Sequence, residues 1–307
     1  MEQALEISEL NQRFGIPEIV KIVAGHGGLT TVEVTSRTAQ GEMYLHGAHV
    51  TSWKPSDASE VLFVSSQSQW NGSRPIRGGV PVCFPWFSNK ADDVNAPIHG
   101  FVRITAWQLE SIVQNGDAVT VSMSIESNSA TEKWWPVEFR LVHRVTFGPE
   151  LILELEVVNT GKTSFRFEEA LHTYFRVGNI ETVLLKGLNG VDYVDKTDNR
   201  QKKTQNGTIA IVSETDRVYL NTDACVDLED PALNRQITIA KENSMSTVVW
   251  NPWIQKAKAM SDFGDTEWPQ MICIETCNVG DSFVELKPGQ HHQMRSIVRV
   301  SNLKPTS

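Results

Sequence analysis

The chain has 307 residues, of which 40% are hydrophobic and 21% charged, and its formal net charge is -9. This composition is typical of a folded globular protein and excludes intrinsic disorder, which combines low hydrophobicity with high net charge. It also disfavours nucleic-acid or membrane-surface binding, because such proteins carry a basic patch and none is visible.

Short apolar or alternating runs, separated by turn residues, are the dominant pattern and predict β-strands. The predicted strands are Thr30–Ser36, Glu42–Trp53, Val61–Ser65, Phe101–Val113, Val119–Glu126, Phe139–Phe147, Leu151–Asn159, Phe165–Val177, Thr208–Ser213, Val218–Asn221, Ile237–Ala240, Thr247–Trp250, Met271–Thr276 and Met294–Val300. Two short helices are predicted, at Leu5–Phe14 and from Asn251 toward Met260, where an Asn-Pro pair favours a helix start.

No alternation of strands and helices suggests a parallel sheet, and no linker or repeat divides the chain. We therefore expect one all-β domain over residues 1–307, a large antiparallel β-sandwich of two sheets, with residues 1–25 as an N-terminal extension packed on it.

The N-terminus has no cationic start followed by an apolar stretch, which disfavours a secretory signal and predicts a cytoplasmic location. The apolar runs are too short to span a bilayer, so no membrane association is expected. Four cysteines are too few for a disulfide framework and are expected to be buried, reduced thiols.

Two loop-like stretches contain groups that could bind a ligand. The Gly- and Pro-rich segment 71–87 has Arg74 and Arg77 as its only charges, and it is either a structural loop or a binding loop. In the second stretch, His99 and Arg103 are four residues apart and would share a face if the segment is extended. A packed structural histidine remains the alternative interpretation there.

The third stretch, Phe165–Val177, alternates between an apolar face and a polar face that includes His172. That polar face is too polar for a core between sheets and resembles a cleft surface. Histidine has an unperturbed pKa close to neutrality, so His172 is a candidate acid or base.

A carboxylate partner is available in the apolar run 271–277, which has Glu275 in its middle. Glu is depleted in strands, so this residue is paired, at a strand end, or functional. Burial there would raise the pKa of the carboxyl group, which suits a general base working near neutral pH. The sequence alone does not show whether Glu275 and His172 meet.

The sequence lacks the motifs typical of nucleotide binding, of a serine nucleophile and of a metal site. No nucleotide-binding glycine pattern and no Gly-x-Ser-x-Gly nucleophile motif occurs, and His291 and His292 are adjacent and should face opposite ways. No metal or cofactor is expected. Trp53, Trp70, Trp86 and Trp250 lie beside polar loop residues and could stack on sugars or simply be core residues.

The chain resembles the glucose-6-phosphate 1-epimerases, or hexose-6-phosphate mutarotases, of the aldose 1-epimerase (galactose mutarotase-like) superfamily. Six motifs carry the resemblance: Pro75–Pro81, His99–Arg103, Leu171–Arg176, Glu214–Asp216, Val248–Trp253 and Met271–Glu275. They occur in family order over most of the chain. The resemblance implies a large β-sandwich with a carbohydrate cleft on one concave sheet, and it implies no cofactor.

The resemblance also implies roles for single residues. His172 corresponds to the general acid and Glu275 to the general base of ring opening. Arg77, His99, Arg103 and Asp216 correspond to substrate-binding positions, with the two arginines holding the 6-phosphate. The chain departs from the family pattern at Ile98, where a Gln contacts the substrate, which affects one hydrogen bond to the sugar.

Three functions are therefore open. The first is anomerisation of a hexose 6-phosphate, with glucose 6-phosphate the preferred substrate, by a monomer that needs no nucleic acid. The second is mutarotation of unphosphorylated aldoses, in which Arg77 and Arg103 only shape the cleft. The third is a non-catalytic sugar-phosphate-binding regulator, which would not need both His172 and Glu275. The joint presence of an acid and a base favours an enzyme.

Overall fold

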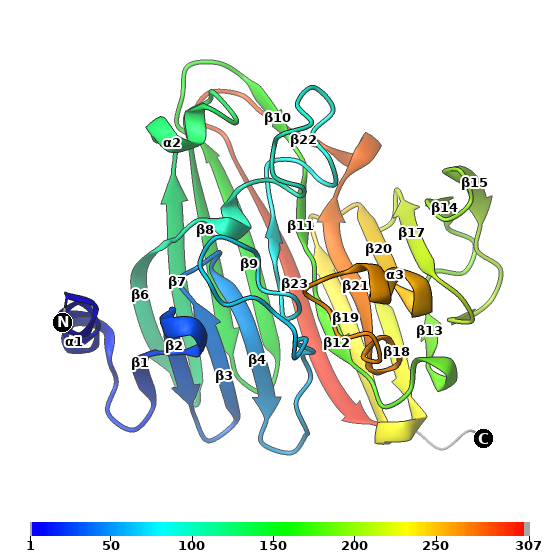
Figure 1. The fold of residues 1–307 in the computed structure, drawn as a ribbon, viewed down its shortest axis with the longest axis horizontal. Coiled ribbons are helices and arrows are strands. Elements are labelled where there is room, and N and C mark those ends of the chain that lie inside the picture. Colours follow the sequence, from blue (N-terminus) through cyan, green and yellow to red (C-terminus); the bar gives the residue numbers. More distant parts are fainter. Residues whose placement is uncertain (1, 304–307) are drawn as a thin grey trace.

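The computed structural model describes residues 2–303, and most of its elements are antiparallel strands (Figure 1). The helices are α1 (Glu2–Phe14), α2 (Ser129–Glu132) and α3 (Trp253–Ala259). The strands are β1 (Val20–Ala24), β2 (Thr30–Thr35), β3 (Ala39–Tyr44), β4 (His49–Pro55), β5 (Val82–Cys83), β6 (Gln108–Asn115), β7 (Ala118–Glu126), β8 (Phe139–Phe147), β9 (Leu151–Asn159), β10 (Phe165–Phe167), β11 (Glu169–Leu171), β12 (Tyr174–Arg176), β13 (Leu184–Lys186), β14 (Asp192–Asp195), β15 (Gln201–Thr204), β16 (Ile209–Ala210), β17 (Thr215–Leu220), β18 (Val226–Asp230), β19 (Arg235–Glu242), β20 (Ser246–Asn251), β21 (Met271–Asn278), β22 (Val284–Leu286) and β23 (His291–Asn302).

Two large sheets, one of eight strands and one of nine, form the body of the protein. The eight-stranded sheet has the order β15-β14-β17-β20-β21-β11-β5, with β12 also paired to β21. The nine-stranded sheet has the order β16-β13-β18-β19-β23-β9-β8-β7-β6. Strands β1–β4 form a further sheet, and an isolated bridge joins Val50 of β4 to Val80, two residues before β5 of the eight-stranded sheet. The predicted all-β antiparallel architecture is confirmed.

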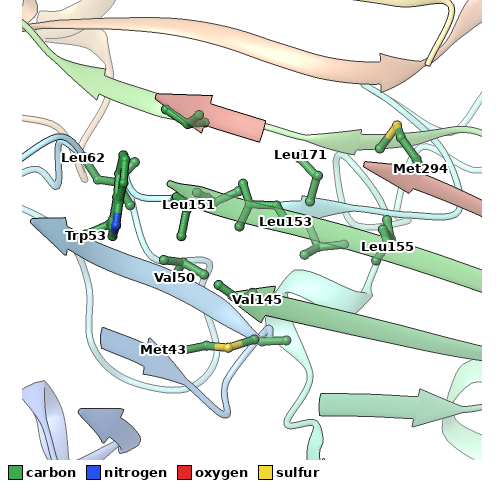
Figure 2. Close-up of a cluster of buried hydrophobic side chains, with 14 of the residues drawn as sticks. Met43, Val50, Trp53, Leu62, Val145, Leu151, Leu153, Leu155, Leu171 and Met294 are labelled. Atoms are coloured by element: carbon green, nitrogen blue, oxygen red, sulfur yellow. The ribbon is translucent and has the colours of Figure 1, made fainter. Parts of the chain in front are cut away.

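The core lies between these layers, and strand alternation explains how it forms. In β9, every second residue is buried, so Leu151, Leu153 and Leu155 point into the core while Glu154 stays partly exposed. Figure 2 shows these leucines packed beside side chains of β3, β4, β11 and β23. Burying each such side chain stabilises the fold by about 1.5–3 kcal/mol. Trp53 of β4 is fully buried there.

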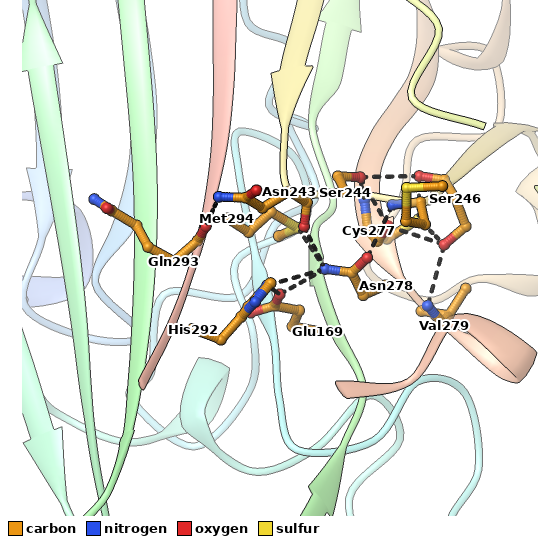
Figure 3. Close-up of polar contacts among 11 residues, drawn as sticks. Glu169, Asn243, Ser244, Ser246, Cys277, Asn278, Val279, His292, Gln293 and Met294 are labelled. Carbon is orange, nitrogen blue, oxygen red and sulfur yellow. Dashed lines mark hydrogen bonds and ion pairs between the residues drawn. The ribbon is translucent and has the colours of Figure 1, made fainter. Parts of the chain in front are cut away.

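A buried polar network joins β21 to the neighbouring strands β11 and β20 and to β23 of the nine-stranded sheet (Figure 3). Glu169 of β11 lies 2.9 Å from His292 Nε2 of β23 and accepts a hydrogen bond of 2.8 Å from the side-chain amide of Asn278. Ser246 donates to the carbonyl of Cys277 on the other side of the strand. These contacts fix the position of β21, the strand on which the predicted base lies.

Predicted and observed elements differ where strand pairing changes partner. β8 and β9 have the predicted bounds. The prediction of one strand over Phe101–Val113 is wrong, because residues 102–104 form a turn of 3-10 helix and β6 begins only at Gln108. The prediction of one strand over Phe165–Val177 is also wrong. β10 pairs with β22, whereas β11 pairs with β21 and β5, so the chain must bend between them.

Within residues 2–24 the chain forms helix α1 and strand β1, and a side chain of the helix contacts the strand. The side chain of Asn11 in α1 donates to the carbonyl of Ile22 and accepts from the Ile22 amide, at 2.6 and 2.9 Å. Ile22 belongs to β1, the first strand of the β1–β4 sheet. The helix is thereby fastened to a sheet edge.

All four cysteines are free thiols, as predicted. Cys83, Cys273 and Cys277 are buried. The expectation of burial is wrong for Cys225, which is exposed, because it lies in a turn just before β18 rather than inside a strand.

Candidate active site

A cavity of about 520 Å³ opens on the face of the eight-stranded sheet turned away from the core. It is lined by all six residues predicted from the sequence, namely Arg77, His99, Arg103, His172, Asp216 and Glu275. Phe87, Tyr174, Lys196, Trp250 and Lys256 also line it. A volume of this size is within the usual range for small-molecule sites.

Strand register explains why residues from distant parts of the chain meet here. One cross-strand row over β17, β20, β21 and β12 consists of Asp216, Trp250, Cys273 and Tyr174. Side chains two residues apart on a strand share a face, so Glu275 follows Cys273 on this face. His172 precedes Tyr174 by two residues. The acid and base candidates are therefore brought side by side.

The Nε2 atom of His172 lies 3.3 Å from Oε1 of Glu275. The two residues are 8% and 1% exposed, so the contact is nearly free of bulk solvent. His172 Nδ1 and Glu275 Oε2 have no hydrogen-bond partner among the described residues. Buried polar atoms are normally partnered, so the pair holds two unsatisfied hydrogen-bonding atoms.

The electrostatic setting of the pair favours its uncharged form. Burial lowers the pKa of His172 well below its usual range, and the nearby Arg103 lowers it further. Burial also raises the pKa of Glu275 well above its usual range, while Lys196 acts in the opposite direction. Both shifts favour a neutral imidazole beside a neutral carboxylic acid.

His99 lines the cavity in a strained backbone conformation, with φ of 63°. Its Nδ1 accepts a hydrogen bond from the amide of Ser88, which places the ring hydrogen of the neutral imidazole on Nε2. Burial keeps the pKa of His99 well below its usual range, so the ring is neutral. The next residue must be glycine, because a Cβ on Gly100 would lie 1.8 Å from the carbonyl oxygen of Phe84.

The expectation that His99 and Arg103 share the face of an extended strand is wrong. The chain turns at His99 and continues into the short helical turn at 102–104. Both side chains still reach the cavity. The side chain of Arg103 donates to the carbonyl of Ile98 at 2.6 Å, which closes the turn.

Arg77 is held by two other side chains. Its Nε and Nη2 atoms donate to one carboxylate oxygen of Asp262, at 3.2 and 2.9 Å. Its Nη1 atom donates to the hydroxyl of Tyr174 at 3.0 Å. The Tyr174 ring in turn stacks on the imidazole of His172, with centroids 4.9 Å apart and planes inclined by 13°. Asp262, Arg77 and Tyr174 thus form a chain of contacts that orients His172.

Sequence reasoning missed Lys196 and Asp262. Lys196 Nζ lies 3.5 Å from Oδ1 of Asp216 and 4.9 Å from the centroid of the Phe87 ring. Nothing in the local sequence distinguishes either residue, since both lie in polar turns. Of the four tryptophans singled out from the sequence, Trp250 is the one that lines the cavity. Among residues 2–303, no cluster of three or more His, Cys, Asp or Glu side chains could hold a metal ion.

Comparison with known proteins places this geometry in a family. A sequence model of the aldose 1-epimerase family matches residues 30–299. The chain belongs to the aldose 1-epimerase family. A protein of Cenchrus ciliaris, named as a candidate glucose-6-phosphate 1-epimerase, is 35% identical over 270 residues, covering 85% of this chain and 81% of that protein. An Escherichia coli protein of the same name is 34% identical over 270 residues, covering 88% and 90%.

Structural comparison agrees with the sequence comparison. The crystal structure of a candidate mutarotase from Salmonella typhimurium superposes with a TM-score of 0.87 at 29% identity, covering 96% of this chain and 99% of that one. The resemblance predicted from the six motifs is confirmed, and the protein is an epimerase.

Proposed function

We propose that this epimerase interconverts the α and β anomers of a hexose 6-phosphate, with glucose 6-phosphate the preferred substrate. The observation that supports this most is the His172–Glu275 contact of 3.3 Å inside a cavity lined by arginines. Anomerisation needs an acid and a base close to one sugar carbon, and a phosphate needs cations. The names of the relatives point to the same substrate.

In the reaction, Glu275 as carboxylate removes the proton of the anomeric hydroxyl while His172 as imidazolium protonates the ring oxygen. The bond between C1 and the ring oxygen breaks, which yields the open-chain aldehyde. Rotation about the C1–C2 bond presents the other face of the aldehyde. His172 then removes the proton from the C5 hydroxyl, Glu275 returns its proton to the aldehyde oxygen, and the ring closes as the other anomer.

The other cavity residues bind and orient the sugar phosphate. Arg77 and Arg103 supply positive charge, and Asp216 accepts hydrogen bonds from sugar hydroxyls. His99 donates from Nε2 toward the substrate. The face of Trp250, which contacts Tyr174 edge-on at 5.9 Å, suits stacking on the apolar face of a hexose.

The test is an anomerisation assay on α-glucose 6-phosphate, coupled to a dehydrogenase specific for the β anomer. We expect His172→Ala and Glu275→Gln each to lower the catalysed rate by about 10²–10⁴-fold, the usual contribution of one proton-transfer group. His291→Ala, which removes an exposed histidine of β23, is the matched control and should leave the rate unchanged. Acceleration that survives both site substitutions would overturn the assignment of His172 and Glu275, and a wild type that gives no acceleration would overturn the proposed reaction.

Glucose assayed beside glucose 6-phosphate at equal concentration separates this function from a mutarotase for free aldoses. The proposal requires faster turnover of the phosphorylated sugar. We further propose that the protein works as a cytoplasmic monomer on this small molecule, without nucleic acid. Within residues 2–303, none of the helices has the length and apolar character needed to cross a membrane.

A further inference from the structure

A second cavity, of about 500 Å³, lies beside the candidate active site. Both cavities are on the same face of the eight-stranded sheet, because Val218 of the second follows Asp216 of the first by two residues on β17. Four residues line both cavities, namely Phe87, Ser88, Asn89 and Lys196. A ligand in the second cavity would therefore lie next to the sugar site and share a wall with it.

Strand register separates the second cavity from the reacting groups. One cross-strand row over β15, β14, β17, β20 and β21 consists of Lys202, Val194, Val218, Val248 and Glu275. Val194 and Val218 line the second cavity, whereas Val248 and Glu275 line the first. Neighbouring strands are about 4.8 Å apart, so Val194 lies about 14 Å across the sheet from Glu275. The second cavity is thus nearer the sheet edge, where β14 and β15 are labelled in Figure 1.

The floor of the second cavity is apolar. Val218 and Val279 are buried, and Val194 and Leu220 are half-buried. Small-molecule sites are typically lined by apolar side chains with a few polar groups that fix the orientation of the ligand. Covering these side chains favours a ligand with an apolar body.

Two cations at the rim of this cavity, Arg200 and Lys202, have no carboxylate partner among the described residues. Lys203 accounts for the difference. It follows Lys202 on β15 and so points to the opposite face of the sheet. There it forms ion pairs of 2.8 and 2.7 Å with Asp195 and Asp198. Both nearby carboxylates are taken by Lys203, which leaves Arg200 and Lys202 able to bind an anion.

The carboxylates in the lining of the second cavity are Glu168 and Asp281. Glu168 accepts hydrogen bonds of 2.8 and 2.6 Å from the backbone amides of Phe87 and Gly280. Backbone donors therefore compensate its charge, and it fixes the wall that the two cavities share. Asp281 is exposed, so it is well solvated and opposes the cations of the rim only weakly.

We propose that the second cavity binds a small organic anion with an apolar body, such as an aromatic carboxylate. The anionic group binds Arg200 and Lys202, and the apolar body covers the floor at Val194 and Val218. This ligand site is separate from the site of ring opening, and it does not depend on the proposed reaction.

Three probes of matched chemistry test the class of ligand by calorimetry at neutral pH and low salt. They are 2-naphthoate, acetate and 2-naphthamide. We expect 2-naphthoate to bind at least about 10-fold more tightly than acetate, because its rings bury apolar surface. It should also bind about 10-fold more tightly than 2-naphthamide, which has the same rings without the charge. Equal affinity for 2-naphthoate and 2-naphthamide would overturn the proposal.

Substitutions locate the bound probe. The double variant Arg200→Asn/Lys202→Thr should raise the dissociation constant of 2-naphthoate by about 10-fold. Asparagine tolerates the positive φ of 59° at Arg200, and threonine suits the strand position of Lys202, so both changes are compatible with the fold. Lys256→Ala is the matched control. It removes a cation that lines the sugar cavity and not the second one, so it should leave the affinity unchanged.

Each result decides the question. An unchanged affinity in the double variant would overturn the proposal. An equal loss in Lys256→Ala would also overturn it, because the probe would then respond to overall charge or occupy the sugar cavity. Circular dichroism checks that the double variant is folded, and Lys202→Thr alone replaces it if it is not. Turnover is not measured, so a failure of the proposed reaction would leave this test intact.

Discussion

Acid should destabilise this protein through two buried histidines behind the candidate site. His49 Nε2 lies 2.7 Å from the carbonyl oxygen of Gly78, and His143 Nδ1 lies 3.1 Å from that of Ala48. A carbonyl oxygen can only accept a hydrogen bond. The ring hydrogen of each neutral histidine therefore lies on the nitrogen that faces the carbonyl. The other nitrogen of each ring has no partner among the described residues. Protonating it would place an unpaired charge in the core.

The size of the stability loss in acid follows from the pKa values of these two histidines. Burial lowers the pKa of His49 to about 3 and that of His143 to about 4, against about 6.5 in the unfolded chain. As the pH falls below 6.5, the unfolded chain takes up protons that the folded protein does not. Each histidine then removes about 1.4 kcal/mol of stability per pH unit. Two units lower, at pH 4.5, the two together remove roughly 5 kcal/mol, comparable to the whole stability of many domains.

Urea unfolding followed by circular dichroism at several pH values between 7.5 and 4.5 measures this slope. His143→Asn places an amide donor where Nδ1 was but cannot titrate. We expect its free energy of unfolding to fall less steeply with acid, by about 1.4 kcal/mol per pH unit. The same change at the exposed His291 is the control. A slope unchanged in His143→Asn would refute the reasoning, whatever the variant's absolute stability.

Two further substitutions test single contacts. Trp53→Phe removes the hydrogen bond of 3.1 Å from the buried indole to the carbonyl of Gly148 and leaves a void, so urea denaturation should show a loss of about 2 kcal/mol with kcat unchanged. An unchanged unfolding midpoint would contradict this. Tyr174→Phe keeps the ring on His172 but loses the contact with Arg77, so kcat should fall about 2- to 10-fold with little change in KM. If only the melting temperature changes, the positioning role is wrong.

The fold was predictable from the sequence where local pattern and tertiary pairing agree. β9 alternates strictly in burial, β8 is rich in apolar residues, and the turn at 148–150 joins them, so local sequence was enough to place both. β15 has the sequence Gln-Lys-Lys-Thr and no apolar residue, and it is a strand only because it pairs with β14 at the sheet edge. Such an edge strand has no local signal. The bend inside 165–177 was missed for the same reason, since it follows from a change of pairing partner.

The candidate site also contains residues that the sequence pointed to and residues that it did not. His172 and Glu275 stand out in the sequence because polar groups are unusual in apolar strands, but only the register of β21 with its neighbours brings them within 3.3 Å. Lys196 lies in a polar turn after β14 and looks like an ordinary surface lysine. Its position in the cavity depends on the backbone contact of its amide with the carbonyl of Asp216. No reading of residues 195–198 alone predicts that contact.

The burial of the His172–Glu275 pair bears on how the reaction proceeds. In the proposed mechanism, the imidazolium–carboxylate form of the pair opens the ring, and the resulting neutral form closes it. Both forms have the same total charge, so the cavity's net charge is constant throughout the cycle. Burial favours the neutral form, while Lys196 favours the carboxylate of Glu275. These opposed influences keep the two protonation forms closer in free energy than burial alone would allow. Reversible proton exchange requires that the two forms be close in free energy.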